Sequence, residues 1–486
     1  MRKCRLSLGA WAAAGMLALG MLLCGAGTDK EDYPVITMAF IVNEEQMQYL
    51  PVVEAEINKL TRERAHAGFR MLPISESDSQ TDRYLMKIKD GQVDLVNVRS
   101  ILEEARKGMI LPMDDLLKEY GGDILELLDE EALAAGRLDE IQYGVPRLHE
   151  WAQSYGVCMR KDLLEKYDIS WEDIHSVEDF EAVLAAVCGK EPGITGVAPL
   201  FMTRMDPLFD SVGVLLSPET SNLVSNYYES QEFIREAEKF REWAQKGYLS
   251  QAGFYYQPRT KMQLQEMMRA GQIFSYFVRY KPGIDVQESN ITGQELAAVR
   301  LTEPLLSSDD LSMALVGINS QCENPEAAMR VLSLLYTDSE IANLICWGIE
   351  GEHYVKNGDG TITYPKGVTA ANTRYNFNRN WQLPNQYLAY VWQGDSTGLG
   401  EEVARYNEEA AKSVAFGFYF DASDVKLERD RCKEVAEAYL EGFLKGEFDL
   451  EKILPVFWQD LRTAGIDKVI NEKQRQLNNF IQNSGS

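Results

Sequence analysis

The stretch that decides the fold is Leu311–Tyr354, LSMALVGINSQCENPEAAMRVLSLLYTDSEIANLICWGIEGEHY. Its apolar run from Met313 to Val316 ends at Gly317 and predicts a buried strand. Asn324-Pro325 then marks a helix start, because asparagine caps helices well and proline suits the first helical position. A second helix is expected from Asp338 to about Cys346. A strand followed by helices favours an α/β fold.

The end of the second helix carries two candidate binding residues, Trp347 and Glu350, beside Gly348 and Gly351. Glycines, an aromatic ring and a carboxylate at a helix end are typical of a functional loop. The alternative is a tight turn with a packed tryptophan, and the local sequence favours neither interpretation.

Strands and helices also alternate near the start of the chain. Apolar runs predict strands at 35–41, 69–74 and 93–98, and helical periodicity predicts helices at 46–64 and 82–89. This alternation predicts a mostly parallel sheet with helices on both faces. At 486 residues the chain is long enough for two such lobes.

Composition excludes several classes of function. The formal net charge of −26 argues against binding to nucleic acid and against charge-driven docking on anionic lipid. Beyond the leader, five scattered cysteines without a CxxC motif predict neither a disulfide framework nor a zinc site, and only four histidines are present, without HExxH spacing. We therefore expect no metal and no cofactor.

The first residues predict an export signal. Three basic residues within the first five positions precede an apolar stretch from Leu8 to Leu23, which is shorter than the roughly 20 residues of a membrane span. Cys24 then resembles the lipid-attachment cysteine of a bacterial lipoprotein, although the two residues before it are bulkier than the usual small ones. We expect a signal peptide at 1–23 and a tether at 24–34; the alternative is cleavage after Ala26.

Several segments resemble the extracellular solute-binding proteins, family 1, which are the substrate-capturing lipoproteins of ABC importers. They include DEIQYGVP at 139–146, NPEAAMR at 324–330, GIEGEHY at 348–354 and AFGFYFD at 415–421. The resemblance extends over nearly all of the mature chain. It implies a two-lobe, periplasmic-binding-protein-like type II α/β fold with a cleft between the lobes.

The resemblance also implies how the chain is divided. Lobe 1 is expected at 35–145 plus 281–340, and lobe 2 at 146–272 plus 341–486, with a C-terminal helical region at 425–483. Crossings between the lobes are expected near 145–150, 272–281 and 340–350.

Candidate ligand contacts follow from these positions. Asn97 and Arg99 come directly after the third strand, where relatives place a loop that faces the ligand. In the first crossing, the polar and aromatic mixture lacks any core periodicity, so we expect contacts from Trp151 and Tyr155 with Arg147 and Glu150 as polar partners. The alternative is that Arg147 and Glu150 pair at a solvated hinge.

Two further segments are rich in aromatic residues. The run at 273–280 reads as a strand, and its carboxyl end makes Phe277 and Tyr280 better cleft candidates than Phe274 and Tyr276. Segment 381–392 is dense in rings and amides, and its candidates are Trp381, Asn385 and Trp392.

The resemblance implies a binding protein that captures a small solute, most simply an oligosaccharide, by closure of two lobes. Amides and carboxylates suit sugar hydroxyls, and aromatic rings suit the C–H faces of a pyranose. The expected partners are the permease subunits of an importer, with a lipid-anchored monomer on the extracellular side of the membrane. A peptide receptor of the same fold is one alternative.

A secreted carbohydrate-active enzyme is the alternative from another class. It would need two carboxylates across a cleft, but Glu350 and Glu352 alternate in direction in an extended segment. No GxSxG elbow and no phosphate-binding loop is present in the sequence. The sequence therefore favours a protein that is not an enzyme.

Overall fold

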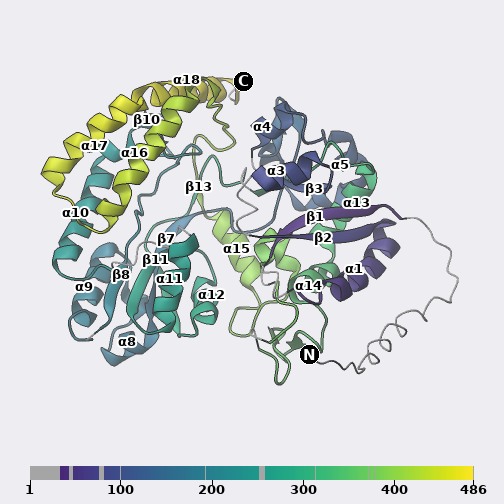
Figure 1. The fold of residues 1–486 in the computed structure, drawn as a ribbon, viewed down its shortest axis with the longest axis horizontal. Coiled ribbons are helices and arrows are strands. Elements are labelled where there is room, and N and C mark those ends of the chain that lie inside the picture. The colour runs from purple at the N-terminus through teal and green to yellow at the C-terminus, as the bar shows by residue number, and fades with distance from the viewer. Residues whose placement is uncertain are drawn as a thin grey trace, which may run out of the picture.

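The computed structural model describes residues 33–484 except 43–46, 76–81, 99, 192, 251–257, 312–313, 370–371 and 378. The chain forms two lobes that lie side by side, with lobe 1 on the right and lobe 2 on the left in Figure 1. Cys24 and Arg99, two of the predicted functional residues, lie outside the described residues. Within these residues, no helix is both long enough and apolar enough to cross a membrane.

Lobe 1 contains a five-stranded sheet in the order β2-β1-β3-β14-β6. Strands β1, β2 and β3 are parallel, and β14 runs antiparallel to both of its neighbours. The carboxyl ends of the parallel strands therefore meet at one edge, which faces lobe 2 (Figure 1). The bounds are β1 (Val35–Ile41), β2 (Gly68–Ile74), β3 (Leu95–Val98), β6 (Val145–Pro146) and β14 (Leu315–Ile318).

Helices cover this sheet as the apolar spacing predicts. The expected face of α13 (Pro325–Thr337) is buried, and Asp338 caps α14 (Ser339–Trp347) by accepting hydrogen bonds from two backbone amides. The other helices of lobe 1 are α1 (Leu50–Ala65), α3 (Asp82–Lys89), α4 (Ile101–Arg106), α5 (Asp114–Tyr120), α6 (Gly122–Leu127) and α7 (Glu130–Ala134), and a small hairpin is formed by β4 (Arg137–Leu138) and β5 (Ile141–Gln142).

Lobe 2 contains a four-stranded sheet in the order β12-β7-β11-β8. The expectation of a mostly parallel sheet is wrong for this lobe, because β7 runs antiparallel to both neighbours and only β11 and β8 are parallel. The elements are β7 (Ser154–Arg160), β8 (Thr195–Ala198), β11 (Ile273–Tyr280), β12 (Leu296–Arg300), α8 (Lys161–Lys166), α9 (Val177–Val187), α10 (Gln231–Gln245), α11 (Pro258–Arg269) and α12 (Ile284–Thr292).

Three C-terminal helices pack on lobe 2 and share a buried core with the segment around β9 and β10. They appear in yellow and yellow-green above that lobe in Figure 1. The elements are β9 (Val214–Leu215), β10 (Val224–Ser225), α16 (Lys426–Leu444), α17 (Leu450–Ala464) and α18 (Ile466–Ser484).

The structure corrects the expected lobe boundaries. Strand β11 is an internal strand of lobe 2, so the chain does not cross near 272–281, and β12 extends the same sheet although 281–340 was assigned to lobe 1. The core of lobe 1 includes α14 and buried residues up to Ala389, so the crossing near 340–350 is also wrong. Apolar periodicity had shown that these segments are buried, but not in which lobe.

The chain crosses between the lobes at 147–153, 301–314 and 395–414, and the first of these agrees with the expected crossing. Residues Gln153 and Leu305 form a bridge, and β13 (Leu305–Leu306) pairs with β17 (Ala411–Lys412), so the three crossing segments lie side by side. Helix α15 (Leu399–Glu408) lies between the lobes (Figure 1). The hinge is therefore a triple connection.

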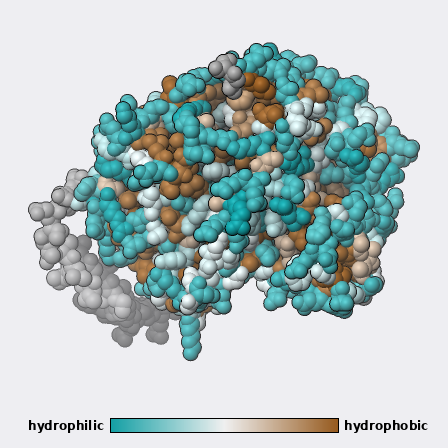
Figure 2. Space-filling model, turned by 180° about the vertical axis from the view of Figure 1, so that it is seen from behind, coloured by the Kyte–Doolittle hydropathy of each residue, from teal (hydrophilic) through white to brown (hydrophobic). Residues whose placement is uncertain are grey.

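Seen from behind, the surface is mostly hydrophilic with scattered hydrophobic patches (Figure 2). The remaining short elements are the hairpin β15 (Val355–Lys356) and β16 (Ile362–Thr363), and the 3-10 turns η2 (Trp171–Asp173), η3 (Tyr227–Glu229), η5 (Asn380–Gln382), η6 (Gln386–Leu388) and η7 (Ser423–Val425).

Candidate binding site at the interlobar junction

Arg147 lies where the first crossing segment leaves lobe 1. Its side chain is buried, and its guanidinium donates to the carbonyl oxygens of Ala314 at 3.3 Å and Trp381 at 3.2 Å. Burial lowers the pKa of Arg147, and no ion pair to it is found among the described residues. A guanidinium has five donors, so carbonyl partners alone leave it able to bind further oxygen atoms.

Two buried amide oxygens lie in the same wall of lobe 1. Oδ1 of Asn97 and Oδ1 of Asn380 have no hydrogen-bond partner among the described residues. Val316 of β14 pairs with Asn97 on one side and with Val145 on the other, so Asn97 lies two strands from the start of the first crossing. Buried acceptors without a donor are costly, which favours a ligand or water that supplies one.

Trp381 supplies an exposed aromatic ring next to these polar groups. It lies on η5 directly after Asn380, its carbonyl oxygen accepts the hydrogen bond from Arg147, and it is 42% exposed. Among the residues that the structure describes, Trp381 is the only phenylalanine, tyrosine or tryptophan that is exposed, so its position beside a buried cation is unusual. The structure thus joins Arg147 to Trp381, and Asn97 lies in the lobe 1 sheet two strands from the start of the same crossing segment.

Tyr155 and Tyr280 lie on neighbouring strands at the edge of lobe 2 that leads into the hinge. Both are half-buried, and burial raises the pKa of each phenol. Arg279 pairs with Tyr155 across the two strands and is exposed. Sequence reasoning missed Arg279, although a cation near the end of an apolar strand was a usable signal.

Glu150, in the first crossing segment, bonds to side chains from both lobes. It forms an ion pair with Lys281 at 2.6 Å and accepts a hydrogen bond from Gln386 at 2.9 Å. Burial alone would raise its pKa, but the nearby Lys281 and His149 and the hydrogen bonds from Lys281 and Gln386 together outweigh burial and lower the pKa to about 2. The expected alternative, a pair between Arg147 and Glu150, does not form; each has other partners.

Both the side chain and the backbone of Trp151 form hydrogen bonds within the protein. Its indole nitrogen donates to the carbonyl oxygen of Arg147 at 2.7 Å, and its backbone amide donates to Oδ1 of Asn407 at 2.9 Å. Asn407 belongs to α15 and also donates to the carbonyl oxygen of His149 at 2.9 Å. These contacts fix the first crossing segment against the third.

Several predicted residues are not brought into this junction. Phe277 is fully buried in the core of lobe 2 against Phe180 and Trp243, so its expected place in the cleft is wrong. Strand β11 is buried on both faces from Ile273 to Val278, so a position near its carboxyl end did not make Phe277 accessible. Asn385 is buried and donates to the carbonyl oxygen of Tyr336 at 2.8 Å.

Trp347 and Trp392 form a separate aromatic group in lobe 1. Their ring centroids are 5.6 Å apart, and the indole nitrogen of Trp347 donates to the carbonyl oxygen of Tyr390 at 3.0 Å. Nearby, Glu350 is exposed and pairs with Lys356 at 3.1 Å. Of the two interpretations that the sequence left open for Trp347, the structure shows the packed tryptophan. A ligand contact by Trp392 or Glu350 stays a prediction.

A surface depression of about 790 Å³ lies at the opposite edge of the lobe 1 sheet, around the start of β1 and the turn after α3. It includes none of the predicted contacts. In the part of the chain that the structure describes, no group of three or more histidine, cysteine or acidic residues is placed to hold a metal ion.

A family model described as "Domain of unknown function (DUF3502)" matches residues 414–482. A carbohydrate ABC transporter substrate-binding protein of Streptococcus pneumoniae serotype 4 (strain ATCC BAA-334 / TIGR4) is 22% identical, over 98% of this chain and 98% of that protein.

Solved structures agree with this match. The N-glycan transport solute binding protein NgtS from Streptococcus pneumoniae has a TM-score of 0.81 and 22% identity, over 93% of this chain and 100% of that chain. The same protein in complex with Man1GlcNAc has a TM-score of 0.73 and 21% identity, over 92% and 100%. The chain has the type II solute-binding-protein fold. This confirms both the resemblance to the extracellular solute-binding proteins and the two-lobe α/β architecture that the sequence predicted.

Proposed function

We propose that this protein is the extracellular substrate-binding component of an ABC importer and that it captures an oligosaccharide between its lobes. The observation that carries the proposal is the wall of lobe 1, where exposed Trp381 lies beside buried Arg147 and the unpaired oxygens of Asn97 and Asn380. A sugar presents hydroxyl donors, hydroxyl acceptors and flat C–H faces, and this wall offers a partner for each.

Each side chain has a separate role in this proposal. Hydroxyl groups donate to the amide oxygens of Asn97 and Asn380, while the guanidinium of Arg147 donates to hydroxyl oxygens. The ring of Trp381 covers one face of a pyranose. Tyr155 and Tyr280 on lobe 2 complete the proposed contacts, so that closure of the hinge brings two half-sites together.

The relatives support a carbohydrate ligand. The protein matched over nearly the whole chain is named as a carbohydrate-binding transport component, and NgtS has been crystallised with Man1GlcNAc and with Man5GlcNAc. These relatives are binding proteins, in agreement with the prediction that the chain is not an enzyme. Export of the chain, a lipid at Cys24, a monomeric state and docking on permease subunits belong to the same proposal.

The test is a thermal-shift screen of the mature protein with Man1GlcNAc, Man5GlcNAc, a fructan and a set of short peptides. A ligand that binds only the folded state raises the melting temperature. We expect a mannose- and N-acetylglucosamine-containing sugar to do so and the peptides to have no effect. Stabilisation by peptides alone would overturn the carbohydrate assignment, and shortened sugar recovered by chromatography would overturn the assignment as a binding protein.

The variant Trp381→Ala tests whether the sugar binds at this wall of lobe 1. Loss of one aromatic face is expected to weaken sugar binding by roughly 3- to 10-fold, which corresponds to about 0.5–1.5 kcal/mol. The matched control is Trp171→Ala, which removes a half-buried tryptophan on lobe 2 away from the junction. Equal losses in both variants, or no loss in Trp381→Ala, would place the ligand elsewhere.

A further inference from the structure

The C-terminal segment reaches back across the junction to lobe 1. This segment begins at 414, where the match to the domain of unknown function starts, and its core is shared with lobe 2. The hydroxyl of Tyr419 nevertheless donates to the carbonyl oxygen of Ala135, directly after α7 of lobe 1. The ring of Tyr419 also packs against the buried apolar cluster of lobe 1 that includes Ile101 and Ile110.

A second contact spans the same gap two residues later. Asp421 forms an ion pair with Arg106, the last residue of α4 in lobe 1. The side chains are 55% exposed for Arg106 and 30% exposed for Asp421, so salt reaches this pair. Hydrogen bonds from Ser423 and Arg106 outweigh the effect of burial and lower the pKa of Asp421 to about 2, so the carboxylate is charged at neutral pH.

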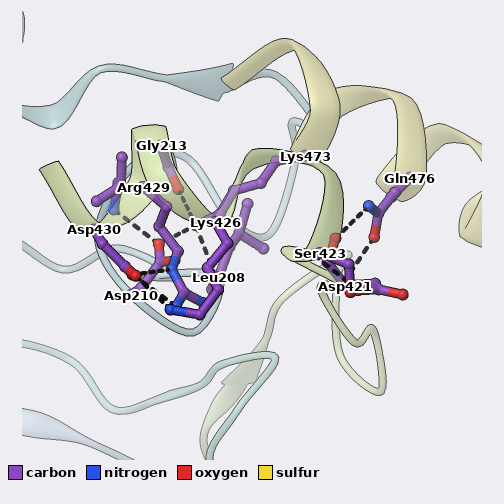
Figure 3. Close-up of polar contacts among 11 residues, drawn as sticks. Leu208, Asp210, Gly213, Asp421, Ser423, Lys426, Arg429, Asp430, Lys473 and Gln476 are labelled. Atoms are coloured by element: carbon purple, nitrogen blue, oxygen red, sulfur yellow. Dashed lines mark hydrogen bonds and ion pairs between the residues drawn. The ribbon is translucent and has the colours of Figure 1, made fainter. Parts of the chain in front are cut away.

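Helix α18 fixes the backbone that carries these two side chains. The side-chain amide of Gln476 accepts from the backbone amide of Asp421 at 2.9 Å and donates to its carbonyl oxygen at 2.8 Å. Figure 3 shows these two bonds beside Ser423, which donates to the Asp421 carboxylate. The reach of Tyr419 and Asp421 toward lobe 1 is therefore set by the C-terminal helix.

The same helix holds a strained loop behind Tyr419. Leu208, Phe209 and Ser211 all have positive φ angles, of 45°, 77° and 61°, which cost free energy for residues other than glycine. Fully buried Lys473 of α18 donates to the carbonyl oxygens of Leu208 at 2.8 Å and Gly213 at 3.1 Å and pairs with Asp210 (Figure 3). The ring of Phe209, held in this way, lies 5.6 Å from that of Tyr419.

We propose that Tyr419 and Asp421 form a clasp, mounted on α18, that holds the two lobes together before ligand binds. The inference depends on the two-lobe fold and goes beyond the proposed function, because it assigns the C-terminal segment the role of limiting how far the lobes open. Backbone strain and a buried charge both cost free energy, and packing alone does not require either of them. The loop that bears these costs supports the ring of Tyr419, which reaches lobe 1. Removing the clasp favours the open form and raises the apparent dissociation constant for ligand.

The test measures lobe separation without ligand, by small-angle X-ray scattering of the full mature chain. Arg106→Glu places two like charges opposite each other and is expected to increase the radius of gyration. The double variant Arg106→Asp with Asp421→Arg restores an ion pair of reversed polarity and is expected to return the wild-type value. Tyr419→Phe keeps the ring and loses the bond to Ala135, so it is expected to give a smaller increase.

The matched control is Arg462→Ala, because Arg462 pairs with Glu229 at 2.7 Å within lobe 2 and is similarly exposed. We expect no change in its radius of gyration. High salt is expected to increase the radius of gyration of the wild type toward the value of Arg106→Glu. A radius of gyration that stays at the wild-type value in Arg106→Glu and Tyr419→Phe would overturn the clasp, and so would an increase of the same size in the control. No ligand enters these measurements, so they stand whether or not the protein binds a sugar.

Discussion

Arg147 is the residue at which the hinge and the candidate site meet. Its guanidinium joins two segments of lobe 1, the carbonyl of Ala314 at the end of the second crossing and the carbonyl of Trp381 in the proposed wall. A buried cation without an ion pair lowers the stability of the fold. The proposed role of Arg147 in ligand binding would account for a buried cation at this position.

Replacing this cation separates its two roles. Arg147→Met removes the buried charge together with two hydrogen bonds, so we expect the melting temperature to change little. The affinity for sugar is expected to fall at least tenfold, because hydrogen bonds to a charged group are worth about 1.5–3 kcal/mol. Calorimetric titration measures the affinity. The control is Arg160→Met, which loses the ion pair with Asp162, so we expect a lower melting temperature and an unchanged affinity for sugar. A loss of affinity in Arg160→Met but not in Arg147→Met would contradict the role of Arg147 in binding.

Asp310, in the second crossing segment, is expected to make the stability of the protein depend on pH. Burial and neighbouring Asp309 raise the pKa of Asp310 to about 7, although Ser307 and Gln153 donate hydrogen bonds to it. The folded state thus keeps a proton that the unfolded state loses near its ordinary pKa of about 4, so stability falls as pH rises between these values. Asp310→Asn is expected to melt roughly 2–4 °C higher than the wild type at pH 8 and to lose this advantage at pH 4. Scanning calorimetry across this pH range measures both melting temperatures. If the prediction is wrong, the variant and the wild type will differ by the same amount at every pH.

At the scale of single elements, the sequence predicted local structure well and its placement poorly. The strand at 273–280 and the helix at 82–89 have the expected bounds, because period and turn residues are local signals. The expected crossing at β11 was wrong, since burial on both faces does not reveal which sheet a strand joins. The candidate site shows the same limit: exposure separates Trp381 from Phe277, and exposure depends on distant contacts.

The strained loop at 206–213 provides a prediction at this scale. Ser211 has a φ of 61°, which glycine adopts without steric cost, so Ser211→Gly is expected to stabilise the protein or leave it unchanged, despite the greater entropy of the unfolded chain. Lys473→Met leaves the carbonyl oxygens of Leu208 and Gly213 without their donor and Asp210 buried without its closest cation, so we expect a loss of about 3–5 kcal/mol. Urea unfolding monitored by fluorescence measures both. A loss of stability in Ser211→Gly would show that the loop is not strained at this position.

At the scale of the whole molecule, the triple connection predicts rigid-body closure. The segments at 147–153, 301–314 and 395–414 are bonded side by side, so the lobes rotate about a shared axis while each core stays intact. We expect a bound sugar to reduce the radius of gyration without changing the far-ultraviolet circular dichroism. Scattering with and without ligand measures the compaction. An unchanged radius of gyration at saturating ligand would contradict closure.

The antiparallel position of β14 has a consequence for how the chain matures. This strand fills the gap between β3 and β6, yet it is synthesised after every strand of the lobe 2 sheet. Until it arrives, two strand edges of lobe 1 are open to pairing with other chains, which is a hazard for aggregation. Chains truncated before residue 315 should therefore be held by chaperones or lost to proteolysis, and neither lobe can be produced alone as one uninterrupted fragment.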